Sequence, residues 1–166
     1  MKVKKILLLM SLMLLCFSCF IHTGNRMDGQ CRPKKPNFKL NKAFSNGTDK
    51  LVFNKIYVVD SELKPFGFGF YPDGRLIYVY SKDGFPLKIE DVITKNWDNA
   101  PAIGYWSIDG DKIKTEYFSC SNSGNYIRNQ GEIKGDTLFF ERDCGSNPFK
   151  SYKCYDKYIL SDMVFR

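Results

Sequence analysis

Apolar and polar residues alternate along most of the chain beyond residue 50, in short runs separated by turn signals. The run from Phe66 to Phe70 reads FGFGF and is the clearest case. Period-two alternation places the three phenylalanines on one face of a β-strand and the two glycines on the other. The sequence Pro72-Asp73-Gly74 follows, and this combination of proline and glycine favours a tight turn. We therefore expect a β-hairpin over residues 65–81.

Similar runs predict most of the remaining chain to be β-strand. The expected segments are a strand at 51–59, a hairpin joining 103–108 to 112–120, a hairpin joining 126–134 to 137–142, and a last strand at 152–160. Only residues 88–97 carry apolar positions at helical spacing (Ile89, Val92, Ile93), which predicts a short helix. Sequential hairpins close most naturally into a barrel, because closure removes exposed sheet edges. The expected fold is all-β: one up-and-down antiparallel barrel of about eight strands over residues 49–166, with at most one short helix.

The first twenty residues have a different pattern. Three lysines precede the apolar run Ile6–Leu15, which is too short to cross a bilayer but has the length of the apolar region of a secretory signal. The sequence Cys16-Phe17-Ser18-Cys19 comes next, and a small residue before a cysteine resembles the lipobox of bacterial lipoproteins. This resemblance implies a signal peptide over residues 1–18, lipidation of Cys19 and attachment to a membrane. Ordinary signal cleavage after Ser18, giving a secreted protein, is the alternative.

Residues 19–48 are expected to form the lipidated N-terminus and a flexible tether, since they contain glycine, proline and asparagine without a sustained period. Loss of residues 1–18 removes three lysines and no acidic residue, which lowers the formal net charge from +7 to +4. The remaining charge is scattered apart from a basic cluster at Arg32–Pro36. Together with the export signal, this argues against nucleic-acid binding. The expected location is the bacterial cell envelope, at the outer membrane or the periplasmic face of the inner membrane.

Four cysteines outside the signal region predict two disulfides formed in an oxidising compartment. The preferred pairing is Cys120 with Cys144 and Cys31 with Cys154, because Cys120 and Cys144 both follow expected strands at one end of the meander. The alternative pairs Cys144 with Cys154 and Cys31 with Cys120. These four cysteines include no Cys-x-x-Cys pair, and the single histidine, His22, is far from three of them. We therefore expect neither a metal site nor a cofactor.

Two motifs in the second half of the chain carry a family resemblance. The run Gly104–Ile113 (GYWSIDGDKI), followed by Gly131–Leu138 (GEIKGDTL), resembles the small lipocalin-like lipoproteins of Bacteroidetes-type bacteria. The segment Phe70–Arg75 is similar to the aromatic strand and turn of the same proteins. The resemblance spans roughly residues 50–160. It implies a lipocalin-like barrel and an envelope location, and it does not specify a substrate.

A barrel of eight strands either fills its interior with side chains or holds one small ligand. Aromatic residues on the alternating strands are the candidates for the interior and for binding a small apolar or amphipathic ligand: Phe66, Phe68, Phe70, Tyr78, Tyr80, Trp106, Phe118 and Phe140. Gly67 and Gly69 are expected to leave space for such a ligand. The alternative is a fully packed barrel that serves as a protein–protein interaction or structural module.

No catalytic constellation is found in the sequence. Glu116, Glu132 and Glu141 lie on expected strands close to basic residues, and we expect them to be solvated charges on the outer face. The sequence Asp109-Gly110-Asp111 lacks the spacing and the terminal glutamate of a calcium-binding loop and is better explained as a hairpin turn. We therefore expect a binding or structural protein rather than an enzyme.

Overall fold

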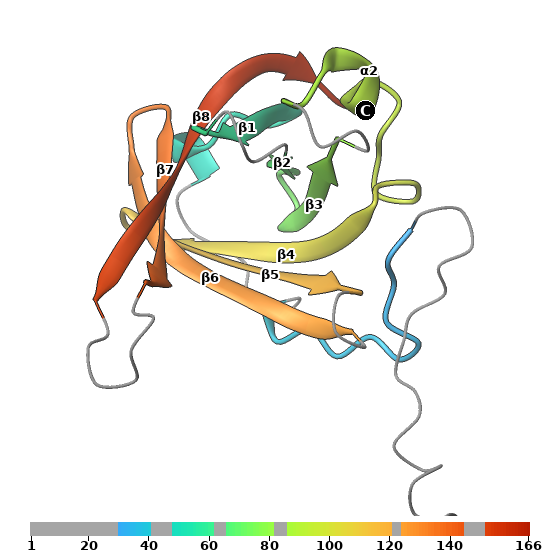
Figure 1. Ribbon diagram of the computed structural model, residues 1–166, viewed down its shortest axis with the longest axis horizontal. Helices are drawn as coiled ribbons and strands as arrows, with labels where there is room; N and C mark the ends of the chain where they lie inside the picture. The colour runs from blue at the N-terminus through green and yellow to red at the C-terminus, as the bar shows by residue number, and fades with distance from the viewer. Residues whose placement is uncertain (1–29, 41–47, 62–65, 82–85, 121–123, 145–151) are drawn as a thin grey trace, which may run out of the picture.

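Eight antiparallel strands follow one another around a closed barrel in the computed structural model (Figure 1). Each strand pairs with the next one in sequence, and β1 pairs with β8 to complete the ring. The elements are η3 (Thr48–Lys50, a 3₁₀ turn), β1 (Lys55–Val59), β2 (Phe66–Phe70), β3 (Arg75–Tyr80), α2 (Ile89–Val92), β4 (Ala102–Asp109), β5 (Lys112–Ser119), β6 (Asn125–Lys134), β7 (Thr137–Asp143) and β8 (Lys153–Val164). The structure describes residues 30–40, 48–61, 66–81, 86–120, 124–144 and 152–166. The expected all-β barrel of eight strands is confirmed.

The helix is shorter than the pattern at 88–97 predicts: α2 covers only four residues. Beyond it, the side chain of an asparagine forms hydrogen bonds with backbone groups that a longer helix would use. The side-chain amide of Asn99 donates to the Thr94 carbonyl at 2.9 Å, and its oxygen accepts the Asn96 N–H at 2.8 Å. Such local side-chain bonds compete with helical ones and end the helix after a single turn.

The two ends of the barrel differ in how the strands are connected. The turn end carries the tight β2–β3, β4–β5 and β6–β7 turns, in which Gly74, Gly110 and Gly135 adopt positive φ. The loop end carries the four longer connections. At the turn end, Leu51 and Phe53 fold inward, and the Phe53 ring lies 5.9 Å from that of Trp106. The strand expected at 51–59 therefore begins only at Lys55, since the preceding residues close the barrel.

The inward faces of the strands form an aromatic core centred on Phe68. This side chain is fully buried, and its ring lies 5.1–5.7 Å from those of Tyr78, Tyr117, Phe140 and Tyr158. Edge-to-face and tilted ring pairs at these separations add about 0.5–1.5 kcal/mol each to the stabilisation that burial provides. The middle of the barrel is therefore filled by its own side chains.

A second apolar cluster lies outside the barrel, where α2 and the C-terminus pack against β1, β2 and β3. Gly67 and Gly69 face this cluster, since the phenylalanines of β2 face inward. A Cβ on Gly69 would lie 2.5 Å from the Phe165 ring, and one on Gly67 would lie 2.6 Å from Ile56. The expectation that these glycines leave room for a ligand is therefore wrong, because they make room for outer packing.

Residues 30–40, which the sequence pattern assigned to a tether, lie along the outer face of the barrel, and we refer to them as the strap. At one end, the Cys31 N–H donates to the Pro101 carbonyl at 2.6 Å. Further along, Phe38 is buried, with its ring 5.1 Å from that of Tyr105 and 5.0 Å from that of Tyr126. The flexible tether predicted for residues 19–48 therefore does not extend through the strap. Residues 19–29 and 41–47 lie outside the described part of the chain.

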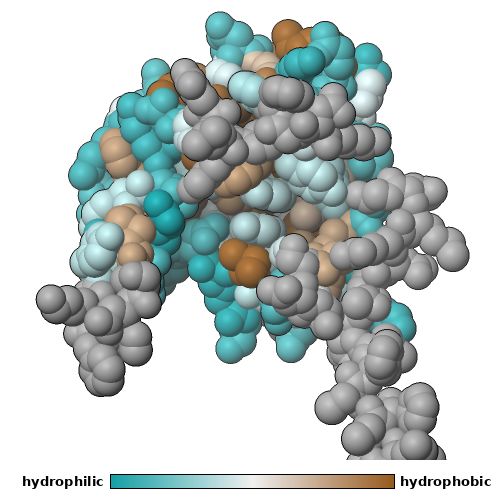
Figure 2. Space-filling model, viewed as in Figure 1, coloured by the Kyte–Doolittle hydropathy of each residue, from teal (hydrophilic) through white to brown (hydrophobic). Residues whose placement is uncertain are grey.

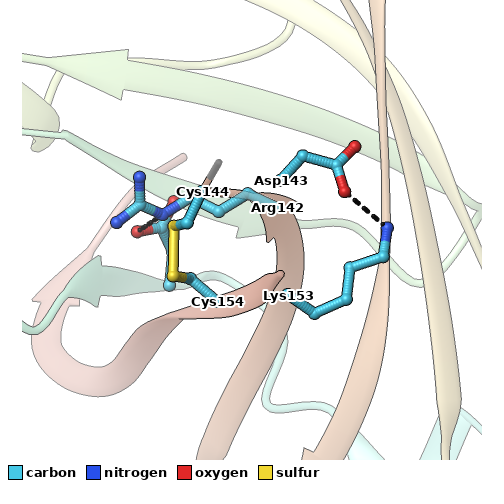
Figure 3. The surroundings of a disulfide bond; sticks show 6 residues. Arg142, Asp143, Cys144, Lys153 and Cys154 are labelled. Carbon is cyan, nitrogen blue, oxygen red and sulfur yellow. Dashed lines mark ion pairs between the residues drawn. A yellow bond between two sulfur atoms is a disulfide. The ribbon is translucent and has the colours of Figure 1, made fainter. Parts of the chain in front are cut away.

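The disulfides are Cys31–Cys120 and Cys144–Cys154, with Cα separations of 5.6 and 5.8 Å. The preferred pairing was wrong and the alternative is confirmed. Cys144 and Cys154 lie on the paired ends of the β7–β8 hairpin (Figure 3), within bridging distance, whereas β5 and β7 are two strands apart. The strap brings Cys31 to the end of β5, which a flexible tether does not predict.

Candidate functional site

Three tyrosines gather inside the barrel toward its loop end. Tyr78 of β3 and Tyr117 of β5 stack with ring centroids 4.7 Å apart and planes inclined by 9°. Tyr158 of β8 reaches the same place from the other side of the barrel, through its contact with Phe68. Strand alternation explains the arrangement, because all three side chains occupy inward positions on their strands.

The hydroxyl groups of these tyrosines make no hydrogen bond to any other described residue. Within the same residues, every fully buried side-chain nitrogen or oxygen has a partner. The three hydroxyls must therefore border space that water can reach. We call Tyr78, Tyr117 and Tyr158, with the space beside them, the tyrosine site.

Burial changes the acid–base behaviour of the tyrosine site. It raises the pKa of Tyr117 to about 12. It raises the pKa values of Tyr78 and Tyr158 further, and the neighbouring phenols contribute in both cases. Asp156 adds to the effect on Tyr158. All three phenols therefore remain neutral hydrogen-bond donors at physiological pH.

Polar side chains flank the tyrosine site on β5 to β8. Thr115 is the inward neighbour of Tyr117 on β5, and its hydroxyl oxygen accepts the Asn129 side-chain amide at 3.3 Å. On β8 the inward neighbour of Tyr158 is Asp156, whose carboxylate is 3.0 Å from the Arg142 guanidinium. One side of the site therefore offers hydrogen-bonding groups and a half-exposed cation, while its floor is aromatic.

The barrel wall is incomplete between β6 and β7. These strands pair only between Gly131–Lys134 and Thr137–Phe140, although both continue toward the loop end. We call the gap between Asn125–Gln130 and Glu141–Asp143 the seam. Figure 2 shows the lower outline of the molecule indented between the end of the β7–β8 hairpin and the β5–β6 sheet.

A groove of about 500 Å³ occupies the seam. Inward residues such as Thr115, Asn129 and Arg142 line it, so the groove reaches into the barrel wall. The outward-facing Lys114 and the strap residue Lys39 also line it. The groove has the volume of a typical small-molecule or peptide site.

Most of the aromatic residues expected in the interior are there. Phe66, Phe68, Phe70, Tyr78, Tyr80, Trp106 and Phe140 occupy inward positions on their strands. Phe70 and Trp106 are buried toward the turn end and belong to the packed core, whereas Tyr80 is 40% exposed. Phe118 is the exception: it faces outward and packs on Tyr126, with the rings 5.2 Å apart.

Sequence reasoning missed Tyr117 and Tyr158. Tyr117 directly precedes Phe118, and both faces of this part of β5 are apolar, so the alternation did not show which residue faces inward. Thr115 pairs with Trp106, whose side chain lies in the core. This pairing shows that the odd-numbered residues of β5 face inward. Tyr158 lies within a strand whose inward face was not assigned.

The three glutamates expected on the outer face behave differently. Glu132 is exposed and pairs with Lys134, as expected of a solvated charge, and Glu141 is half-buried at the seam. Glu116 faces outward but is completely buried beneath the strap, so the expectation of a solvated charge was wrong for this residue. Its carboxylate accepts the Lys39 N–H at 2.5 Å, the Leu40 N–H at 3.0 Å and the Arg128 guanidinium at 2.7 Å.

Other predicted features are placed as follows. Asp109–Asp111 forms the β4–β5 turn, and Asp111 pairs with Lys50. Among the described residues, no group of three His, Cys, Asp or Glu side chains is arranged to hold a metal ion.

No helix within the described ranges is long and apolar enough to cross a bilayer. Cys19 and His22 lie outside these ranges.

No protein-family model matches this chain, and no curated protein or solved structure matches it. The structure itself therefore defines the class: an all-β, closed barrel of eight strands with two disulfides. The resemblance to lipocalin-like lipoproteins stays a prediction.

Proposed function

We propose that this protein is an envelope lipoprotein whose lipocalin-like barrel binds a small amphipathic molecule at the tyrosine site. The observation that supports this most is the set of three tyrosine hydroxyls above an aromatic floor, none of them hydrogen-bonded to another described residue. Ligand sites are commonly apolar concavities with a few well-placed polar groups. The site has this composition.

The chemistry of the site indicates which molecules would fit. Its phenol groups are neutral donors, so they favour a ligand with carbonyl, hydroxyl or anionic oxygen acceptors. The rings of Phe66 and Phe68 offer apolar contact to the remainder of the ligand. Since the middle of the barrel is already filled by Phe68 and its neighbours, the ligand would occupy only the loop end.

The envelope location is supported by the disulfides and by the N-terminal sequence. Two disulfides are typical of proteins that fold in an oxidising compartment. Cys19, the proposed lipidation site, is twelve residues before Cys31. An extended chain of that length reaches about 40 Å, so the strap would hold the barrel close to the membrane.

Native mass spectrometry tests the ligand proposal. The protein is purified without denaturation from its own host, as wild type and as the variant Tyr117→Phe/Tyr158→Phe. We expect the wild type to retain a small molecule and the variant to lose it, because two hydrogen bonds of about 1 kcal/mol each change affinity roughly tenfold or more. The control is Tyr152→Phe, which changes a tyrosine that is 63% exposed. A wild-type protein without any retained molecule, or equal retention by all forms, would contradict the proposal.

The anchor is tested separately by Cys19→Ser. We expect this variant to move from the membrane fraction to the soluble fraction, because it cannot be acylated at that position. Cys16→Ser is the matched control and should stay with the membrane. Membrane association of Cys19→Ser equal to that of the wild type would rule out lipidation at this residue.

A further inference from the structure

We propose that the seam between β6 and β7 is a docking site for an extended acidic segment of a partner protein, which adds to the edge of β6 as a further strand. The proposal depends on neither the lipid anchor nor the tyrosine site. It rests on the direction of the backbone groups, the groove that occupies the seam and the charges that line it.

The hydrogen-bonding direction of the β6 backbone follows from its pairing with β5. The Ile133 N–H donates to the Asp111 carbonyl at 2.8 Å, on the β5 side. The register between these strands is unbroken from Asn125 to Glu132. Backbone groups alternate along a strand, so the odd-numbered residues of β6 point toward β5 and the even-numbered residues toward β7.

Three even-numbered residues of β6 lie in the seam and point their backbone toward it: Gln130 next to the paired segment, and Arg128 and Tyr126 further along. Tyr126 and Arg128 lie beyond Gly131, the last β6 residue that pairs with β7 in this direction. Within the described chain, no backbone partner faces their N–H and C=O groups. Unpaired edge groups of this kind are the template for strand addition by an extended peptide.

The seam is held open by the attachment of β7 to β8. The two strands pair along the whole of β7, and the Cys144–Cys154 disulfide joins their ends. The ion pairs Arg142–Asp156 and Lys153–Asp143 flank this disulfide; Figure 3 shows the second pair beside it. Over Glu141–Asp143, β7 therefore pairs with β8 alone.

Cations outnumber carboxylates in the groove: five line it, against Glu141 and Asp143, and this excess favours an acidic occupant. Three of its five cations already have carboxylate partners: Arg128 with Glu116, Arg142 with Asp156 and Lys153 with Asp143. Lys39 and Lys114 make no ion pair within the described residues, and both side chains are exposed. These two lysines would face an acidic segment bound in the groove.

The segment that follows the strap in sequence does not match this charge. Residues 41–47, which lie outside the described ranges, contain one lysine and no acidic residue. The protein as a whole is basic, with a formal net charge of +7, or +4 without residues 1–18, which favours encounter with acidic partners. A segment from another protein is therefore the expected occupant.

Amide hydrogen exchange measured by NMR tests this proposal, with a short synthetic peptide of alternating glutamate and valine as the probe. In the free protein, the Tyr126 and Arg128 amides should exchange quickly, whereas those of Ile127 and Asn129 should be protected by β5. Saturating peptide should protect Tyr126 and Arg128 and leave the other two unchanged. The odd-numbered amides are thus a control within the same strand.

Charge variants test the electrostatic part of the proposal in the same titration. Lys114→Glu should weaken peptide binding about three- to tenfold, and Lys114→Gln should have a smaller effect. Lys88→Glu is the matched control, because Lys88 is an exposed lysine beside α2, on another part of the barrel. It should leave the affinity within about twofold of wild type.

Three results would overturn the proposal. The first is an absence of saturable binding by the acidic peptide. The second is binding that leaves the exchange of Tyr126 and Arg128 unchanged, which would place the peptide elsewhere. The third is strong protection of these two amides in the free protein, which would show that the chain itself occupies the seam.

Discussion

Glu116 shows how one buried carboxylate can fasten a segment remote in sequence. It lies on the outer face of β5 and would be solvated if the strap were absent. Two strap N–H groups and the Arg128 guanidinium satisfy its oxygens instead. Hydrogen bonds to a charged group contribute about 1.5–3 kcal/mol each, so this residue accounts for a substantial part of the attachment of the strap.

Glu116→Gln should lower the free energy of unfolding by about 2–3 kcal/mol, because the amide removes the charge and replaces an acceptor oxygen with a donor. Urea unfolding followed by fluorescence measures the change. Glu132→Gln is the matched control on the next strand, and its exposed side chain should alter stability by less than about 0.5 kcal/mol. Equal effects of the two substitutions would mean that the strap does not depend on Glu116.

At the scale of elements, each disulfide fixes a different kind of contact. Cys144–Cys154 joins neighbouring strands of one hairpin and spans only 10 residues of sequence. Cys31–Cys120 spans 89 residues and attaches the strap to the end of β5. In the chain-entropy description, closing the longer loop restricts the unfolded chain more.

Replacing both cysteines of a pair with serine should reveal this difference. The loss in free energy of unfolding should be about 4–5 kcal/mol for Cys31→Ser/Cys120→Ser and about 3 kcal/mol for Cys144→Ser/Cys154→Ser. Denaturant titration of both double variants under oxidising conditions provides the comparison. The reverse order of stability would argue that the strap adds little constraint.

At the scale of the whole molecule, the barrel is divided along its axis. The turn end is closed by tight turns and by Leu51 and Phe53, and the middle is filled by rings around Phe68. The loop end carries the tyrosine site and adjoins the seam. Packing therefore stabilises one end of the barrel, while groups available for binding are concentrated at the other.

The buried phenols predict a fall in stability at alkaline pH. Their folded pKa values are raised, to about 12 for Tyr117, above the ordinary value of about 10. Above pH 10 the unfolded chain loses phenolic protons that the folded chain retains, so the stabilisation present below pH 10 is lost as pH rises. Each phenol contributes up to about 1.4 kcal/mol per pH unit in this window.

Denaturant unfolding at several pH values from about 9 to 11 measures this slope. Tyr117→Phe should reduce the slope, because it removes one group whose pKa differs between the folded and unfolded states. Comparing it with the wild type cancels the contribution of the lysines. An unchanged slope would show that Tyr117 ionises as easily in the folded protein as in the unfolded chain.

The sequence alone determined the strands and their order. Strict alternation in β2 and glycine-containing turns such as Gly110 and Gly135 are local signals, and strands joined in this way have little choice but to pair with their neighbours. The pattern also identified most of the aromatic residues that face the interior. These features depend on residues close together in the chain.

Only the tertiary structure decided the features that depend on distant segments. The strap covers β5 at Glu116, and its Phe38 packs on Tyr126, against which Phe118 is buried on the outside of the barrel. The same docking brings Cys31 to Cys120 and buries Glu116. Local alternation cannot show that a strand has apolar neighbours on both faces, because the second neighbour comes from another part of the chain. The tyrosine site and the seam likewise arise from strands far apart in sequence, and their existence depends on how the barrel closes.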